Sequence, residues 1–290
     1  MDHDDATVGT ILSRREAFTL AARASLGLAF GGLILSDADA AFQAKAQREV
    51  HLVASPAVTE GPFFVDEKLN RSDLIGDTKR PSVVNGAPLT VTFTLYRLVD
   101  GKFSPLKGAM VDVWHCDAAG NYSDVEAGMN PDDTTGQNWL RGYQISDENG
   151  VVKFKTIVPS WYRGRTTHIH FKVRQTDGKA TKEFTSQIFF DDAVADGIFA
   201  NAPYKLRGPR DMRNATDGVY SERQVDGSQA GEHLLVDLKK AASGKGYETK
   251  FAVALTDSNL RTGGRGRRGG PGGPGGPPPG GFGGPPPDWE

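Results

Sequence analysis

Short runs of β-branched and aromatic residues, separated by Gly, Asn, Asp and Pro, fill the chain between residues 81 and 190. In the run LTVTFTLY the apolar positions alternate with threonines, so one face of the segment is buried and the other meets water. The pattern predicts strands over residues 89–98, 109–117, 141–146, 151–158, 168–175 and 184–191. We therefore expect a mainly β fold, an antiparallel β-sandwich with few helices.

Turns and loops separate the expected strands. The sequence DENG at 147–150 predicts a hairpin turn with Asn-Gly at its tip, and TDGK at 176–179 predicts a second turn. Residues 117–139 and 159–167 lack a strand pattern and are expected to be the long loops of an active site. The best candidate for a late helix is 232–241, although its hydrophobic run also fits a buried strand.

The first forty residues have the layout of an export signal. Arg14 and Arg15 precede the apolar run ASLGLAFGGLIL, and Ala-x-Ala follows at 38–40. This arrangement resembles a bacterial twin-arginine signal, with cleavage near Ala40, and predicts a periplasmic or extracellular protein. The apolar run is shorter than the roughly 20 residues of a membrane-spanning helix, so no stable membrane span is expected. The alternative is an ordinary amphipathic helix at the N-terminus.

The last segment, 263–290, holds thirteen glycines and eight prolines in 28 positions. Such a composition buries too little apolar surface to offset its ordering entropy, and we expect a disordered tail. Its RGRRGG stretch resembles an arginine-glycine segment that binds nucleic acid, but a single copy is weak evidence for that function. A solvated linker or a surface-adhesion tail is favoured. The remaining residues, 46–262, are predicted to form one domain.

The composition is that of a soluble globular protein, with 38% hydrophobic and 24% charged residues. A formal net charge of −2 gives no electrostatic reason to expect nucleic acid or an anionic membrane as partner, so a small molecule is favoured. The one cysteine, Cys116, excludes an intrachain disulfide and cysteine-rich zinc modules. A metal site in this chain must therefore use His, Tyr, Asp or Glu.

Two histidines at alternate positions are the first candidates for such a site. His168 and His170 lie in an expected strand, so both imidazoles leave the same face and could share one metal ion. The pair does not name the metal, and two solvated histidines on a polar face fit the pattern equally well. His115, at the end of another expected strand, is expected to be packed or hydrogen-bonded rather than a ligand.

Two tyrosines narrow the choice of metal. Tyr162 lies six residues before His168 in a loop that also carries Arg165, and Tyr122 lies in the glycine-flanked loop AAGNYSD. A phenol with an ordinary pKa near 10 becomes a phenolate ligand only beside a strongly acidic cation. If the two loops converge over the histidines, a trivalent iron suits these oxygen donors better than zinc or copper.

Four motifs in order resemble the intradiol ring-cleavage dioxygenase family, most closely protocatechuate 3,4-dioxygenase-like subunits and their exported relatives. They are TEGPFF at 59–64, GAMVDVWHCDAAGNYS at 108–123, RGYQISDENGVVKFKTIVPSWYRGRTTHIHFKV at 141–173 and FTSQIFFDD at 184–192. The region after Asp192 is less clearly similar, and no residue role is carried over to it. Arg163 and Thr167 stand where related sequences often have proline.

The resemblance implies a mononuclear non-haem Fe(III) site. By this likeness Tyr122 and His170 are equatorial ligands, Tyr162 and His168 are axial ligands, and Tyr162 is displaced when substrate binds. Arg165 and Gln187 then lie beside the metal, with Arg165 stabilising negative charge on the substrate. The implied reaction cleaves a catechol-type ring between its two hydroxylated carbons with O2, and gives a cis,cis-muconate-type diacid.

Two other functions stay open at this point, together with the choice of substrate. A copper-binding sandwich akin to superoxide dismutase would also use an H-x-H strand, but it needs further histidines. A secreted, non-catalytic β-sandwich that binds aromatics or polysaccharide is the second alternative. Residues 62–77, including Arg71 and Asp73, are expected to contact substrate substituents. Association into a homo-oligomer is left open.

Overall fold

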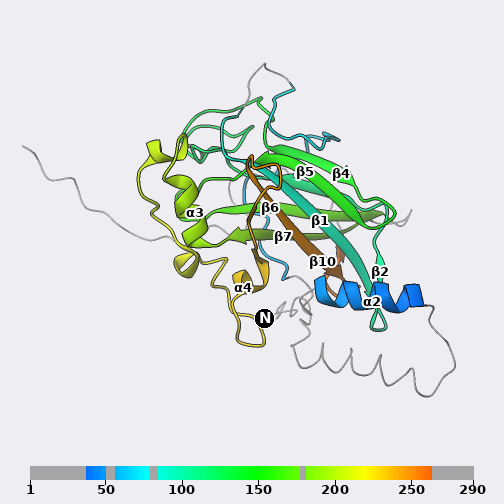
Figure 1. Ribbon diagram of the computed structural model, residues 1–290. Coiled ribbons are helices and arrows are strands. Elements are labelled where there is room, and N and C mark those ends of the chain that lie inside the picture. The colour runs from blue at the N-terminus through cyan, green and yellow to red at the C-terminus, as the bar shows by residue number, and fades with distance from the viewer. Residues whose placement is uncertain (1–36, 50–55, 79–83, 177–180, 263–290) are drawn as a thin grey trace, which may run out of the picture.

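The computed structural model describes residues 37–49, 56–78, 84–176 and 181–262 (Figure 1). Its strands are β1 (Pro88–Val99), β2 (Lys102–Pro105), β3 (Met110–Trp114), β4 (Arg141–Ile145), β5 (Val151–Ile157), β6 (His168–Thr176), β7 (Thr181–Phe190), β8 (Leu235–Val236), β9 (Lys239–Lys240), β10 (Tyr247–Leu255) and β11 (Arg261–Thr262). Its helical segments are α2 (Asp37–Glu49), α3 (Asp192–Phe199), η1 (Tyr204–Arg207), η2 (Asn214–Thr216) and α4 (Ala230–Leu234). The mainly β prediction is confirmed.

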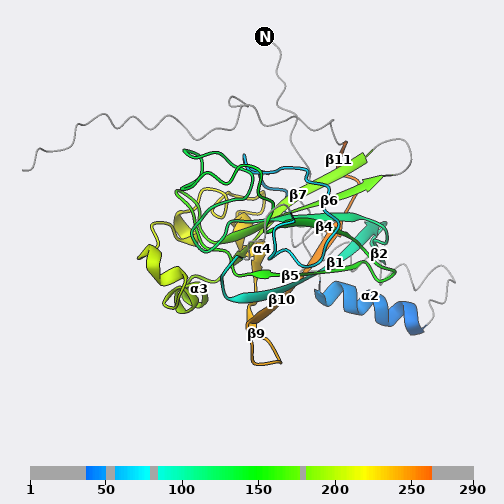
Figure 2. The ribbon, with the colours of Figure 1, turned by 90° about the horizontal axis from the view of Figure 1, so that it is seen from above.

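The strands form two sheets that pack as a sandwich. One sheet has the order β2-β1-β10-β9, with β5 also paired to β1, and the other has the order β11-β7-β6-β3-β4, with β8 paired to β7. Figure 2 shows the two layers, with β6 and β7 in one and β1 and β10 in the other. Each sheet contains one parallel pair, β1 with β10 and β7 with β8, so the sandwich is mixed rather than wholly antiparallel.

The core lies between the sheets. The alternation seen in the sequence buries Val91, Phe93 and Leu95 of β1 while the intervening threonines stay partly exposed. From the opposite sheet, Phe171 meets Phe93 with ring centroids 5.0 Å apart. All six predicted strands are present, although β3 ends at Trp114, three residues before the predicted end.

The DENG segment is a turn, but the predicted hairpin is wrong. Gly150 N–H donates to the carbonyl of Asp147 over 2.9 Å, and the Asp147 carboxylate accepts from the amides of Asn149 and Val151. The strands on either side belong to different sheets, because β4 pairs with β3 and β5 pairs with β1. The turn therefore carries the chain from one layer to the other. The second predicted turn falls at 176–179, of which 177–179 lie outside the described residues, between antiparallel β6 and β7.

The late segment 232–241, expected to be a helix or a buried strand, contains both. Helix α4 ends at Leu234, and the chain then runs into the short strands β8 and β9. Leu234 and Val236 are both buried, so the continuous hydrophobic run serves a helix end and a strand in succession.

Helix α2 docks on the sandwich ahead of the predicted domain start. The Phe42 ring lies 6.0 Å from that of Tyr96, and the Gln43 amide both donates to and accepts from the backbone of Phe103. The helix runs through Ala40 and through residue 46. The paired arginines and the glycine-rich tail lie outside the described residues. Within the described ranges, every helix is too short or too polar to cross a membrane.

Candidate metal centre

Strand β6 presents both predicted histidines on one face of its sheet. His168 and His170 are 1% and 0% exposed, and their Nε2 atoms lie 3.0 Å apart. Between them Ile169 turns into the core, as strand alternation requires. The register sets Trp114 of β3 and Gln187 of β7 on either side of His170, and the Trp114 ring stacks on His170 at 4.9 Å. The sheet therefore fixes the imidazole pair.

Tyr122 reaches the pair from the long loop between β3 and β4. Its backbone amide donates to Asn130 Oδ1 over 2.9 Å, and its carbonyl accepts from the side chains of Asn130 and Thr134. These bonds join two distant parts of the loop and hold the tyrosine in place. Its phenol is buried, with the hydroxyl 3.4 Å from His168 Nε2.

Tyr162 lies in the loop between β5 and β6. Its ring centroid lies 5.4 Å from that of Tyr122 and 5.5 Å from that of His168. The predicted convergence of two loops over one sheet is therefore present. Of the four predicted ligand side chains, Tyr162 alone belongs to a partly exposed residue.

The segment 59–64 covers the same face of the sheet. Phe63 stacks on Tyr122 with ring centroids 4.4 Å apart and planes 19° from parallel, and it meets the edge of Tyr162 at 5.5 Å. Gly61 has a φ of +70°, and a Cβ added there would lie 3.4 Å from His170 Cε1. Glycine adopts this positive φ without strain, whereas the distance to the ring would itself be an ordinary van der Waals contact. The segment forms one wall of the site, and its residues 62–64 belong to the range expected to contact the substrate.

Burial keeps both imidazoles neutral. It is the main cause that lowers the pKa of His168 and of His170 well below the ordinary value, aided by Arg165 for the first and by His168 for the second. His168 Nδ1 lies 2.6 Å from the carbonyl of Thr166, which makes Nδ1 the donor and leaves a lone pair on Nε2. Among the described residues, His170 Nδ1 has no hydrogen-bond partner. Neutral imidazoles with adjacent Nε2 atoms are suited to a metal ion.

Burial acts on the phenols in the opposite sense. It raises the pKa of Tyr122 well above its ordinary value and also raises that of Tyr162, while the nearby Arg165 opposes both increases. The phenols therefore stay protonated unless a strongly acidic cation binds beside them. Within the described ranges no three His, Cys, Asp or Glu side chains gather as a metal site, so a metal ion here would depend on the tyrosines. Two phenolate oxygens with two imidazoles fit a trivalent iron.

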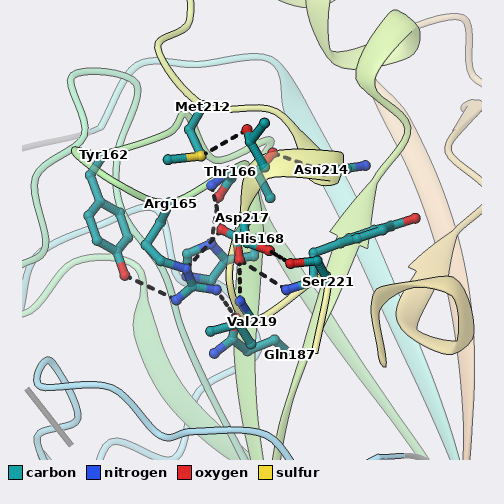
Figure 3. A network of polar contacts seen from close by, with 12 residues as sticks. Tyr162, Arg165, Thr166, His168, Gln187, Met212, Asn214, Asp217, Val219 and Ser221 are labelled. Carbon is teal, nitrogen blue, oxygen red and sulfur yellow. Dashed lines mark hydrogen bonds and ion pairs between the residues drawn. The ribbon is translucent and has the colours of Figure 1, made fainter. Parts of the chain in front are cut away.

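A hydrogen-bonded network extends from this cluster (Figure 3). Arg165 Nη1 lies 3.4 Å from the Tyr162 hydroxyl, Nη2 donates to Gln187 Oε1 over 2.6 Å, and Nε donates to Asp217 Oδ2 over 2.9 Å. Gln187 Nε2 in turn donates to the carbonyl of Thr59, at the start of the segment over the site. The structure brings both predicted non-ligand residues to the cluster, and it adds Asp217, which no sequence pattern indicated.

His115, Arg71 and Asp73, which the sequence also singled out, have their hydrogen-bond partners outside this cluster. His115 is buried with Nδ1 2.8 Å from the Cys116 carbonyl and Nε2 2.6 Å from Thr156 Oγ1, which confirms that it is hydrogen-bonded within the fold. The Arg71 guanidinium donates to three backbone carbonyls and Asp73 caps the amide of Ile75. Arg71 therefore ties its own loop to residues 138–141 rather than presenting its charge to a substrate.

Comparison with known proteins gives consistent matches. A family model described as Dioxygenase matches residues 59–228. The structure of an intradiol ring-cleavage dioxygenase from Tetranychus urticae is similar, with a TM-score of 0.58 and 31% identity, and the match covers 70% of this chain and 94% of that one.

Two curated relatives are similar over a shorter span. Catechol 1,2-dioxygenase from Acinetobacter baylyi is 27% identical over 206 residues, which are 60% of this chain and 61% of that protein. Chlorocatechol 1,2-dioxygenase from Pseudomonas sp. is 29% identical over 154 residues, which are 46% of this chain and 54% of that protein. The chain thus spans less than two thirds of the length of either relative.

Proposed function

The chain belongs to the dioxygenase family, in its intradiol ring-cleavage class, and on that premise we propose that it cleaves a catechol-type ring with O2 at a non-haem ferric ion. Tyr122, Tyr162, His168 and His170 would hold the ion. The observation that carries the proposal is that these four side chains, drawn from two loops and one strand, meet in one buried cluster. The product would be a cis,cis-muconate-type diacid.

A ferric ion at this position would supply the Lewis acidity that ionises the phenols and a bound catechol, and would make the ring reactive toward O2. The protein contributes a dry environment for that chemistry, because Phe63 and Trp114 pack against the ligand rings and are themselves buried. Electrostatic interactions are stronger in such a site than in water.

Tyr162 is suited to accept a proton from the substrate. A catechol must lose two protons to bind as a chelating dianion, and a phenolate released from a metal is a base of the required strength. Partial exposure gives Tyr162 room to move away, whereas Tyr122 is fixed by its loop and by Phe63.

Arg165 is suited to stabilise negative charge on the ring. Its guanidinium is largely buried beside the Tyr162 hydroxyl and cannot lose its proton at neutral pH. A fixed cation of this kind stabilises charge that develops during reaction without needing to reorient. Gln187 fixes one end of the guanidinium through its Oε1.

The test is oxygen uptake by the iron-loaded protein with catechol, protocatechuate, hydroxyquinol and larger lignin-derived diols, with mass analysis after reaction under ¹⁸O2. We expect one substrate or more to give a ring-opened diacid that carries both oxygen atoms. Tyr122→Phe and His170→Ala should lose activity and iron, whereas Tyr247→Phe, on β10 and bonded to Lys240, should keep both. Full activity and iron content in the first two variants would overturn the ligand assignment.

The same experiment separates the two rival functions. A copper-binding sandwich would gain activity or colour with copper rather than with iron. A non-catalytic binding protein would bind aromatics without consuming oxygen. Retention of all four donor side chains in one cluster favours the iron enzyme over both.

We also propose that residues 1–40 direct export through a twin-arginine route. The paired Arg14 and Arg15 carry this proposal. In a bacterial host with that pathway, Arg14→Lys together with Arg15→Lys should leave the protein in the cytoplasm. Unchanged export of the double variant would refute it.

A further inference from the structure

Asp217 is a buried carboxylate that the family's ligand set does not account for. It lies at the end of η2, 52 residues after Arg165 in the loop between β5 and β6, and its side chain is 0% exposed. A buried charge is costly unless it is paired and fully hydrogen-bonded. Asp217 meets that condition with four donors, which divide evenly between its two oxygens.

The two oxygens make contacts of different kinds. Oδ1 accepts from the backbone amides of Val219 and Tyr220, at 2.8 Å and 3.0 Å, and so shapes its own segment. Oδ2 accepts from Arg165 Nε at 2.9 Å and from the backbone amide of Thr166 at 2.8 Å. The second set reaches across to the loop between β5 and β6 (Figure 3).

The Oδ2 contacts decide which edge of the guanidinium faces the metal site. Asp217 occupies the Nε edge of Arg165, which leaves Nη1 toward Tyr162 and Nη2 toward Gln187. An arginine side chain has several freely rotating bonds, and its planar fork is useful only when it is held in one orientation. The bond to the Thr166 amide also fixes the backbone two residues before His168.

We infer that Asp217 is a positioning residue, which orients the Arg165 guanidinium toward the reacting ring and anchors the loop that leads into the histidine pair. The inference rests on the proposed function, because Arg165 is assigned there to the stabilisation of negative charge. The Asp217 carboxylate bonds to Arg165 and to three backbone amides, and to neither phenol, so it acts through Arg165.

The segment around Asp217 has other anchors, so a change at this carboxylate leaves it docked. Asn214 donates to the carbonyl of Phe190 over 2.8 Å and accepts from the Thr166 hydroxyl over 2.9 Å. Arg210 pairs with Asp192 and Asp196 of α3. Asp217→Asn is therefore a usable variant, which keeps the shape of the side chain and removes its charge.

The matched control is Asp196→Asn. Asp196 also forms ion pairs with arginines of the same segment, Arg210 and Arg213, but it makes no contact with Arg165 in the described structure. The control removes one carboxylate charge that pairs with the same segment and leaves the Oδ2 contacts of Asp217 in place.

The first measurement uses the metal-free full-length protein. The Nε–H proton of Arg165, followed by ¹H–¹⁵N NMR, should be protected from exchange with solvent in the wild type and in Asp196→Asn, and should exchange rapidly in Asp217→Asn. The signal is assigned with Arg165→Lys. Equal protection in wild type and Asp217→Asn would overturn the inference.

The second measurement is steady-state kinetics of the iron-loaded proteins with the best substrate of the panel. A misplacement of about 1 Å can cost roughly a hundredfold in rate. We expect kcat of Asp217→Asn to fall about ten- to a hundredfold, with KM changed by less than about threefold, and Asp196→Asn to match the wild type. A merely structural role predicts instead a lower melting temperature with an unchanged kcat of the folded protein, which would overturn the inference.

Failure of the proposed function gives a different pattern. A wild-type protein that cleaves no catechol overturns the proposed function, and with it the catalytic part of this inference. A wild type and an Asp217→Asn variant that are equally active overturn the inference alone.

Discussion

His115 gives a sharp prediction for the dependence of stability on pH. Its imidazole is fully buried, next in the chain to Trp114 of the candidate metal centre, and both ring nitrogens are hydrogen-bonded within the fold. Burial, as the main cause, lowers the pKa of His115 to about 4, and the positive charge of Arg141 adds to the effect. The perturbation is His115→Gln, which retains a donor and an acceptor but does not titrate.

The magnitude follows from the lowered pKa. An unfolded chain binds a proton at this histidine near pH 6.5, whereas the folded protein binds it only near pH 4. Between these values the unfolded state holds more protons, so the free energy of unfolding falls as the pH drops. At roughly 1.4 kcal/mol per pH unit, this histidine alone removes about 3 kcal/mol of stability by pH 4.

The assay is urea unfolding of the metal-free protein at a series of pH values from 7.5 to 4.5. The wild type also carries the buried His168 and His170, whose lowered pKa values act in the same direction, so the useful quantity is the difference between proteins. Between pH 7.5 and 4.5 the free energy of unfolding should fall less in His115→Gln than in the wild type. The difference should be most of those roughly 3 kcal/mol. His233→Gln, at a partly exposed histidine on α4, serves as the control.

Two outcomes would contradict the expected role of His115. A pH dependence in His115→Gln equal to that of the wild type would mean that His115 protonates in the folded protein as readily as in the unfolded chain. Loss of iron from the same variant would mean that His115 is a ligand.

Three further predictions concern the walls of the site and the fold. Phe63→Ala should lower stability by about 3 kcal/mol and weaken iron binding, because it removes the ring stacked on Tyr122; unaltered denaturation and iron affinity would contradict this. Gly150→Ala should cost about 2 kcal/mol or more, since φ is +74° and the new Cβ collides with the Leu95 carbonyl; a neutral effect in urea unfolding would show that the turn relaxes. Burial raises the pKa of Cys116 to about 12, so a thiol reagent should label it only after unfolding; rapid labelling of the native protein would disprove its burial.

Most of the strands could be predicted because alternation of apolar and polar residues reports which face of a strand is buried. It does not report which sheet a strand joins. The DENG turn shows this limit, since its residues satisfy a tight turn whether the next strand pairs back or crosses to the other layer. The partner of a strand depends on contacts far along the chain, such as the parallel pairing of β1 with β10.

The residues of the candidate site were also predictable only in part. The H-x-H pair follows from strand geometry, the two tyrosines were candidates from their places in two long loops, and the resemblance assigned them as ligands. Asp217 lies 52 residues from Arg165, in an irregular segment without periodicity, so no local pattern could join the two. Phe63 was part of a motif, but its stacking on Tyr122 depends on how residues 59–64 cross the sheet.

The most direct test of the four-residue iron site is the visible spectrum on addition of Fe(III) to the metal-free protein. A tyrosinate bound to ferric iron absorbs in the visible by charge transfer and makes a protein burgundy. We predict such a band at one iron per chain in the wild type, weaker in Tyr162→Phe, and absent both in Tyr122→Phe, which should lose iron, and in the double variant. A colourless protein at full iron loading, or a band unchanged in the double variant, would contradict the account.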